Sequence, residues 1–141
     1  MNIWTKVKKH WDAWRLQRRL KRLELYLPLY CKVHGVANAE RQGALAQTRA
    51  GDRLQIVHVP LPDYPNNVYV YSIPLNRVLG YLQGELAEKL VKAFGENLCL
   101  DGVVENTTGG KPGEFIGCNL CIFQSMRYME NETDFNALHG A

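Results

Sequence analysis

The residues best suited to bind a ligand lie at positions 60–67, which read PLPDYPNN. The carboxylate of Asp63 can accept a hydrogen bond from a terminal hydroxyl and would repel a phosphate, and the ring of Tyr64 offers a face on which a nucleobase can stack. Three prolines exclude a helix interior or a central strand, so this segment is predicted to be a stiff loop. The alternative is a structural loop whose tyrosine only covers the edge of the core.

Four more residues could extend such a site. Tyr81 follows Gly80, and a tyrosine there can either face a ligand or pack on the rim of a sheet. Asn66 and Asn67 either bind a ligand or hydrogen-bond their own backbone in a turn, which is the commoner use of asparagine. Arg41 is either a phosphate contact or a solvated helix residue. The candidate site residues after the N-terminal segment are thus Arg41, Asp63, Tyr64, Asn66, Asn67 and Tyr81.

A second concentration of chemistry lies in residues 1–27, which hold eight Lys or Arg, two acidic residues and all three tryptophans. This segment has a formal charge of +6, whereas residues 28–141 carry −3. Its cations can bind phosphates, and the candidate nucleic-acid contacts are Lys8, Arg15, Arg18 and Arg22. Tryptophan interspersed with lysine also fits a helix on an anionic membrane surface. Packing against a protein partner or a second copy is the third alternative.

The other reactive residue types form no catalytic or metal-binding pattern. Cys118 and Cys121 lie in the apolar stretch FIGCNLCIF without a second pair of ligands, so they are predicted to be buried core residues and not zinc ligands. In the absence of an export signal, these two and Cys31 and Cys99 are expected to be reduced. The sequence contains no nucleophile with its base and no phosphate loop. We therefore expect a protein that is not an enzyme and has no metal or cofactor.

Hydrophobic periodicity predicts the elements that position these residues. Residues 2–26 lack Gly and Pro and predict a helix, and residues 82–94 predict a strongly amphipathic helix ended by Gly95. Residues 40–50 predict a short helix or turn. Alternation with a period of two predicts short strands, at residues 29–35, 53–59, 68–73, 77–81, 98–104 and 115–124. The fold class is α+β: a small antiparallel β-barrel or curled sheet with one core helix and a basic N-terminal helix.

The apolar residues of the N-terminal helix change sides near residue 15. One side carries Ile3, Trp4, Val7, Trp11 and Trp14, and the opposite side carries Leu16, Leu20, Leu23 and Leu27. A straight helix cannot bury both sides in one core. Either it docks by its second half and projects the first, or it breaks near Trp14.

Composition divides the chain into three segments. Residues 1–27 form the basic, Trp-rich helix, and residues 28–124 form the barrel domain. Residues 125–141 have weak periodicity and are predicted to be a loosely ordered tail. The chain has no apolar run long enough to span a bilayer and no secretory signal, so a cytoplasmic location is expected.

Several short sequence motifs, in their order along the chain, resemble those of the HIRAN domain. The matching pieces are Gly35-Val36, Arg41-Gln42, Ala44-Leu45, Gly51-Asp52-Arg53-Leu54, Asn66-Asn67-Val68-Tyr69-Val70, Leu79-Gly80-Tyr81-Leu82 and Glu85-Leu86-Ala87, followed by a strand pair around a GG-x-PG turn. The resemblance covers roughly residues 29–123. It implies a modified OB-like barrel that binds a free 3′ end of single-stranded DNA and has no catalytic activity of its own.

The resemblance also implies where the ligand would lie. The family's pocket uses a loop that corresponds here to residues 61–67, an Arg-aromatic pair near Ala37-Asn38 that this chain lacks, and the residue after the glycine of the G-[YH]-L turn, which is Tyr81. Arg41 is the candidate substitute for the missing arginine. We expect a module that binds single-stranded DNA or DNA ends. The alternative is a module that binds a protein or a membrane through its Trp-rich helix.

Overall fold

The computed structural model describes residues 3–124, so the predicted tail at 125–141 lies outside the described residues. The elements in chain order are α1 (Ile3–Arg22), β1 (Leu29–Lys32), α2 (Ala39–Ala46), β2 (Arg53–His58), β3 (Val68–Ser72), β4 (Arg77–Tyr81), α3 (Gly84–Phe94), β5 (Cys99–Thr108) and β6 (Gly117–Phe123). Every predicted helix and strand is present, with ends that differ by a few residues. The predicted α+β class is confirmed.

The six strands form one antiparallel sheet in the order β1-β6-β5-β2-β3-β4. The sheet is strongly curled, and a bridge between His34 and Tyr81 joins its two edges. At this bridge the His34 N–H donates to the Tyr81 carbonyl (2.8 Å) and the Tyr81 N–H donates to the His34 carbonyl (3.0 Å). Gly80 permits the approach, because a Cβ at that position would overlap the His34 carbonyl oxygen.

The inward faces of the strands and one face of α3 form a single core. In β2 and β3 the buried residues alternate with partly exposed ones, as the period-two pattern predicts. Leu90 and Ala93 of α3 join the same cluster of buried side chains. Gly95 ends α3 with a positive φ of 90°, which confirms the predicted stop.

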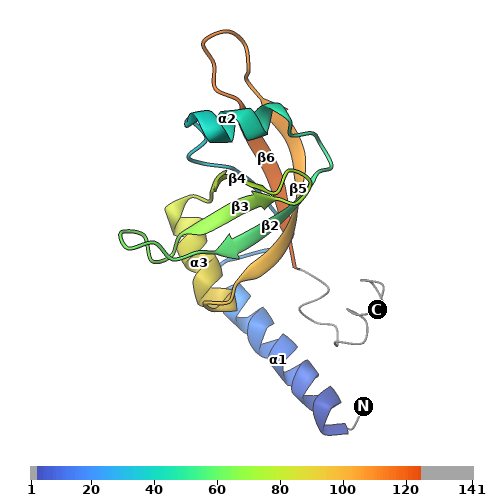
Figure 1. Cartoon of the computed structure of the whole chain (residues 1–141). Coiled ribbons are helices and arrows are strands. Elements are labelled where there is room, and N and C mark those ends of the chain that lie inside the picture. The colour runs from blue at the N-terminus through green and yellow to red at the C-terminus, as the bar shows by residue number, and fades with distance from the viewer. Residues whose placement is uncertain (1–2, 125–141) are drawn as a thin grey trace.

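Two features of the helices refine the sequence prediction. Helix α1 is unbroken over 20 residues and buries Leu16 and Leu20 from its second half, so it docks by that half and projects the first (Figure 1). It packs against α3. The 40–50 segment forms the short helix α2, which packs against β4, so the sheet has two helices beside it and not only one core helix. Among residues 3–124 no helix has the length and apolar character to cross a bilayer.

Candidate nucleic-acid interface

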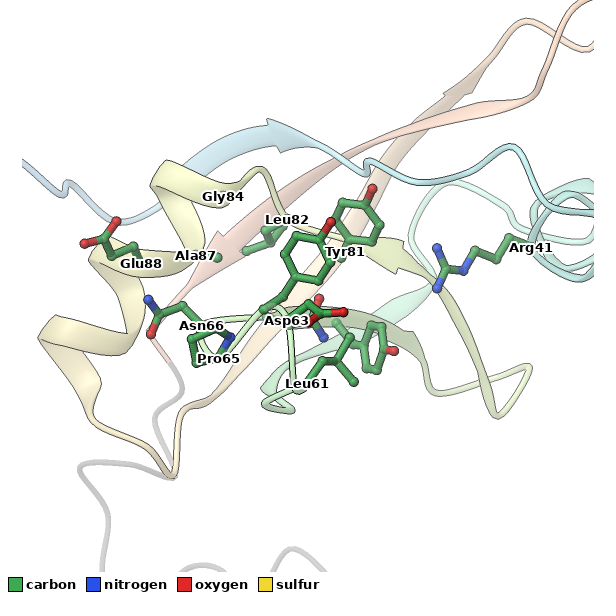
Figure 2. A pocket seen from close by; sticks show the side chains of 13 residues that line it. Arg41, Leu61, Asp63, Pro65, Asn66, Tyr81, Leu82, Gly84, Ala87 and Glu88 are labelled. Carbon is green, nitrogen blue, oxygen red and sulfur yellow. The ribbon is translucent and has the colours of Figure 1, made fainter.

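A pocket of about 430 Å³ opens between the loop after β2, the end of β4, and the start of α3, with Arg41 of α2 at one end (Figure 2). We call it the rim pocket. Its lining residues are Arg41, Leu61, Asp63, Tyr64, Pro65, Asn66, Asn67, Tyr69, Tyr81, Leu82, Gly84, Ala87 and Glu88. All six candidate residues that follow the N-terminal segment line it, although they come from three separate parts of the chain.

The loop that carries Asp63 and Tyr64 is held by its own backbone. The N–H and carbonyl groups of Leu61 and Tyr64 bond to each other at 3.1 and 3.0 Å, and the Val59 N–H donates to the Asn67 carbonyl at 2.9 Å. The side-chain amide of Asn67 donates to the Val59 carbonyl at 3.0 Å, so this asparagine has the structural use that its residue type favours. The loop therefore presents Asp63 and Tyr64, both exposed, on a fixed backbone.

His58 joins this loop to the segment that follows α3, a role that the sequence did not reveal. Its ring nitrogens lie 2.7 Å from the Pro65 carbonyl oxygen and 2.8 Å from the Glu96 carbonyl oxygen. A neutral imidazole has one N–H and can donate to one of them, whereas the imidazolium donates to both. These two carbonyls, Pro65 foremost, raise the pKa of His58 above its ordinary value, and partial burial opposes the shift. Protonated His58 thus ties the pocket loop to the segment after α3.

Arg41 and Tyr81 form a fixed pair at one end of the rim pocket. The Arg41 guanidinium carbon lies 5.7 Å from the centre of the Tyr81 ring, and its Nη1 donates to the Gly35 carbonyl at 2.7 Å. Gly35 has a φ of 68°, and a Cβ there would overlap the tyrosine ring. Arg41 is therefore not simply a solvated helix residue: its position is set by a ring and a carbonyl from two other segments.

Tyr69 is a third pocket tyrosine that the sequence analysis missed. It lies in β3 directly opposite Tyr81 in β4, so the two side chains point to the same face of the sheet. The signal was available in the stretch VYVYS, where the buried valines must alternate with outward tyrosines. Three tyrosines, Tyr64, Tyr69 and Tyr81, thus line one pocket.

The charges of the rim pocket are mixed. Figure 2 shows Glu88 and Arg41 toward opposite ends of the pocket, with Asp63 and Tyr81 between them. Two carboxylates and one guanidinium give the lining a formal charge of −1. Such a lining suits rings and hydroxyl groups better than a run of phosphates.

The four candidate cations of α1 lie elsewhere. None of Lys8, Arg15, Arg18 and Arg22 lines the rim pocket, and α1 projects away from the sheet (Figure 1). Arg15 lies over the Trp11 ring at 5.4 Å and Arg18 over the Trp14 ring at 4.9 Å. The two tryptophan rings are stacked with their centres 5.3 Å apart. The structure therefore has two separate candidate surfaces.

Cys118 and Cys121 are buried, as predicted. No disulfide is present among the four cysteines. Burial raises the pKa of both Cys31 and Cys118 to about 11, so these thiols stay protonated at neutral pH. Residues 3–124 contain no group of three His, Cys, Asp or Glu side chains that could hold a metal ion.

Comparison of the chain with protein-family models, with curated proteins and with solved structures finds no match. The rim pocket and α1 are the two features of the described chain that bear on function. Of these, the rim pocket collects more of the candidate residues.

Proposed function

We propose that this protein is a non-catalytic module that binds single-stranded nucleic acid, preferably at a free 3′ end, in the rim pocket of an OB-like barrel. The observation that carries the proposal is the convergence of three tyrosines, Asp63 and an immobilised Arg41 on one cavity of about 430 Å³. The tyrosines and the two charged side chains contribute differently to binding.

The tyrosines supply most of the affinity. Tyr64 is 68% exposed, so its ring can receive a base, and Tyr81, which is 39% exposed, offers the part of its ring that Arg41 leaves open. Stacking on an aromatic side chain contributes about 1–3 kcal/mol per base and works for any base. Because the backbone of the Tyr64 loop and the partners of Tyr81 are already fixed, little conformational freedom is lost when a base stacks.

Asp63 and Arg41 supply the preference for an end. The Asp63 carboxylate can accept a hydrogen bond from a terminal 3′ hydroxyl and repels a terminal phosphate or a continuing strand. Arg41 uses Nη1 on the Gly35 carbonyl, which leaves other N–H groups of its planar fork for a phosphate or a base edge. A strand can therefore place its 3′ hydroxyl at Asp63 and a phosphate or base at Arg41 in only one direction.

The resemblance to the HIRAN domain supports the same pocket. Tyr81 and the 61–67 loop are the positions at which that family binds DNA, and both line the rim pocket. This chain departs from the family in the order of its aromatic and acidic loop residues. It also has Asn38 near the position of the family's Arg-aromatic pair, and the Asn38 side chain caps α2. Arg41 on Tyr81 is the arrangement that replaces that pair.

Polarisation titrations with a labelled single-stranded oligonucleotide test the proposal. Tyr64→Ala should weaken binding by about tenfold or more, because a stacking ring is lost. Arg41→Lys should weaken it by about tenfold, because lysine lacks the planar fork. Tyr26→Ala is the matched control, since Tyr26 is equally exposed but lies outside the rim pocket.

A second titration tests the end preference. The oligonucleotide with a free 3′ hydroxyl should bind more tightly than the one with a 3′ phosphate, and Asp63→Asn should remove the difference. Equal affinity of the unmodified protein for the two ends would reject end recognition. Binding that Tyr64→Ala leaves unchanged would reject the rim pocket as the site.

A further inference from the structure

Helix α1 presents an exposed apolar stripe along its projecting half. The stripe consists of Ile3, Trp4, Val7, Trp11 and Trp14, which are 49–78% exposed. These residues share one side of the helix, opposite the buried Leu16 and Leu20 that dock α1 on the body. The stripe has no covering partner within the described chain, residues 3–124.

The charges around the stripe are nearly all positive. By helical spacing, Lys6 and Lys8 flank it on its two sides, and Arg18, Lys21 and Arg22 continue its line toward the body. Asp12 is the sole acidic residue of α1 and falls outside the stripe. Arg15 and Arg18 lie over Trp11 and Trp14, so cations and rings occupy the same surface.

We propose that α1 lies on the surface of a bilayer that contains anionic lipid, with the apolar stripe among the acyl chains and the cations at the headgroups. The cations of α1 indicate that its partner is negatively charged, as anionic lipid headgroups are. The aliphatic residues Ile3 and Val7 identify lipid in particular, because acyl chains match their exposed surface and a nucleic acid offers phosphates and ring faces instead. Tryptophan is enriched at the membrane–water interface, where a helix lying on the bilayer surface would place it.

A second copy fits this surface less well. Trp4, Val7, Trp11 and Trp14 have the 3-4-3 spacing of a coiled coil, but the next two positions of that series are Arg18 and Lys21. The apolar seam therefore spans about two heptads, whereas a sustained coiled coil needs about three or four. Pairing two copies would also bring together two helices of the same strong positive charge.

The full-length protein carries its own reporter for this proposal, because all three tryptophans of the chain are in the stripe. Tryptophan emission is measured while vesicles are added, either of phosphatidylcholine alone or of phosphatidylcholine mixed with phosphatidylserine. We expect a blue shift with the mixed vesicles, quenching by brominated acyl chains, and a much weaker response to the neutral vesicles.

Two sets of variants separate the apolar from the electrostatic contribution. Ile3→Ser combined with Val7→Ser should lower vesicle partition by about tenfold or more. Lys6→Gln combined with Lys8→Gln should lower it by about fivefold for each cation removed and leave the Arg-Trp pairs intact. Ile73→Ser is the matched control, because Ile73 is an exposed aliphatic residue on the body. Tyr64→Ala should also leave vesicle binding unchanged, so a failure of the rim pocket does not affect this test.

Three outcomes would overturn the proposal. The first is an emission spectrum that mixed vesicles do not shift. The second is a blue shift produced by the oligonucleotide alone, which would make α1 a nucleic-acid arm. The third is a blue shift that grows with protein concentration without vesicles, which would indicate self-association.

Discussion

The molecule contains two arrangements of arginine over an aromatic ring, and they are built in different ways. In the rim pocket, Arg41 lies over Tyr81, and the pair is fixed by the Gly35 carbonyl and by the space that a glycine leaves. On α1, Arg18 lies over Trp14 four residues earlier, and both side chains are exposed. The first pair joins two segments that are far apart in the sequence, residues 35–41 and Tyr81, and the second depends on one helical turn.

This difference separates a preformed site from an adaptable surface. A ligand that enters the rim pocket meets rings whose positions are already set, which favours selectivity for a shape. The Arg-Trp pairs of α1 can rearrange on a flat or uneven surface, since exposed pairs of this kind contribute only about 0.5–1 kcal/mol each. We therefore expect substitutions that disturb tertiary contacts of the pocket to have far larger effects than substitutions on the exposed surface of α1.

The largest effect is expected from Gly80→Ala. The added Cβ would overlap the His34 carbonyl oxygen and a Val33 methyl group, and so separate the two edges of the curled sheet. The free energy of unfolding should fall by about 3 kcal/mol or more, measured by urea denaturation. Gly43→Ala is the matched control: it lies in α2 with open space around it, and should stabilise the protein by up to about 1 kcal/mol. Equal stabilities of the two variants would show that the bridge has no special role.

An intermediate effect is expected from pH, through His58. The folded protein raises the pKa of this imidazole above its ordinary value of 6.5, because two carbonyls accept from the charged form. The stabilisation is therefore fully present below about pH 6.5 and is lost as the pH rises through the raised value. Urea denaturation should show that raising the pH through this range destabilises the unmodified protein more than His58→Gln. Parallel profiles of the two proteins would contradict the role of His58 in holding the loop.

The smallest effect is expected from Arg18→Ala. Arg18 is exposed and its ring partner Trp14 lies outside the core, so the free energy of unfolding should fall by about 1 kcal/mol or less. Urea denaturation against Leu20→Ala provides the contrast, because Leu20 is buried and its truncation should cost about 2–5 kcal/mol. A large loss of stability in Arg18→Ala would mean that the exposed surface of α1 supports the fold and is not merely an adaptable surface.

Much of the fold follows from local patterns in the sequence. The buried alternation of Val68 and Val70 and the stripe of α3 predict their elements because each depends on residues near one another in the chain. The change of apolar side near residue 15 likewise predicts that α1 cannot bury both halves. The prediction left open whether the helix breaks, since that depends on whether docking by Leu16 and Leu20 holds the helix without help from its first half.

The parts of the site that the sequence did not reveal depend on distant contacts. Asp63, Tyr64 and Tyr81 could be proposed from residue type, but their meeting in one pocket depends on the pairing of β3 with β4 and on the loop after β2. Arg41 could be read in two ways until the Tyr81 ring and the Gly35 carbonyl were placed beside it. His58 had no visible partner, because its two acceptors are backbone carbonyls, which leave no trace in residue identity.

The bridge between His34 and Tyr81 links the filling of the rim pocket to the stability of the curled sheet. The backbone of Tyr81 joins the two edges of the sheet, and its side chain lines the rim pocket. Any fluctuation that parts the edges therefore also dismantles the aromatic lining. A ligand that binds only the form with joined edges would stabilise that form, and the fraction of molecules with parted edges would fall by a factor that grows with the ratio of ligand concentration to Kd.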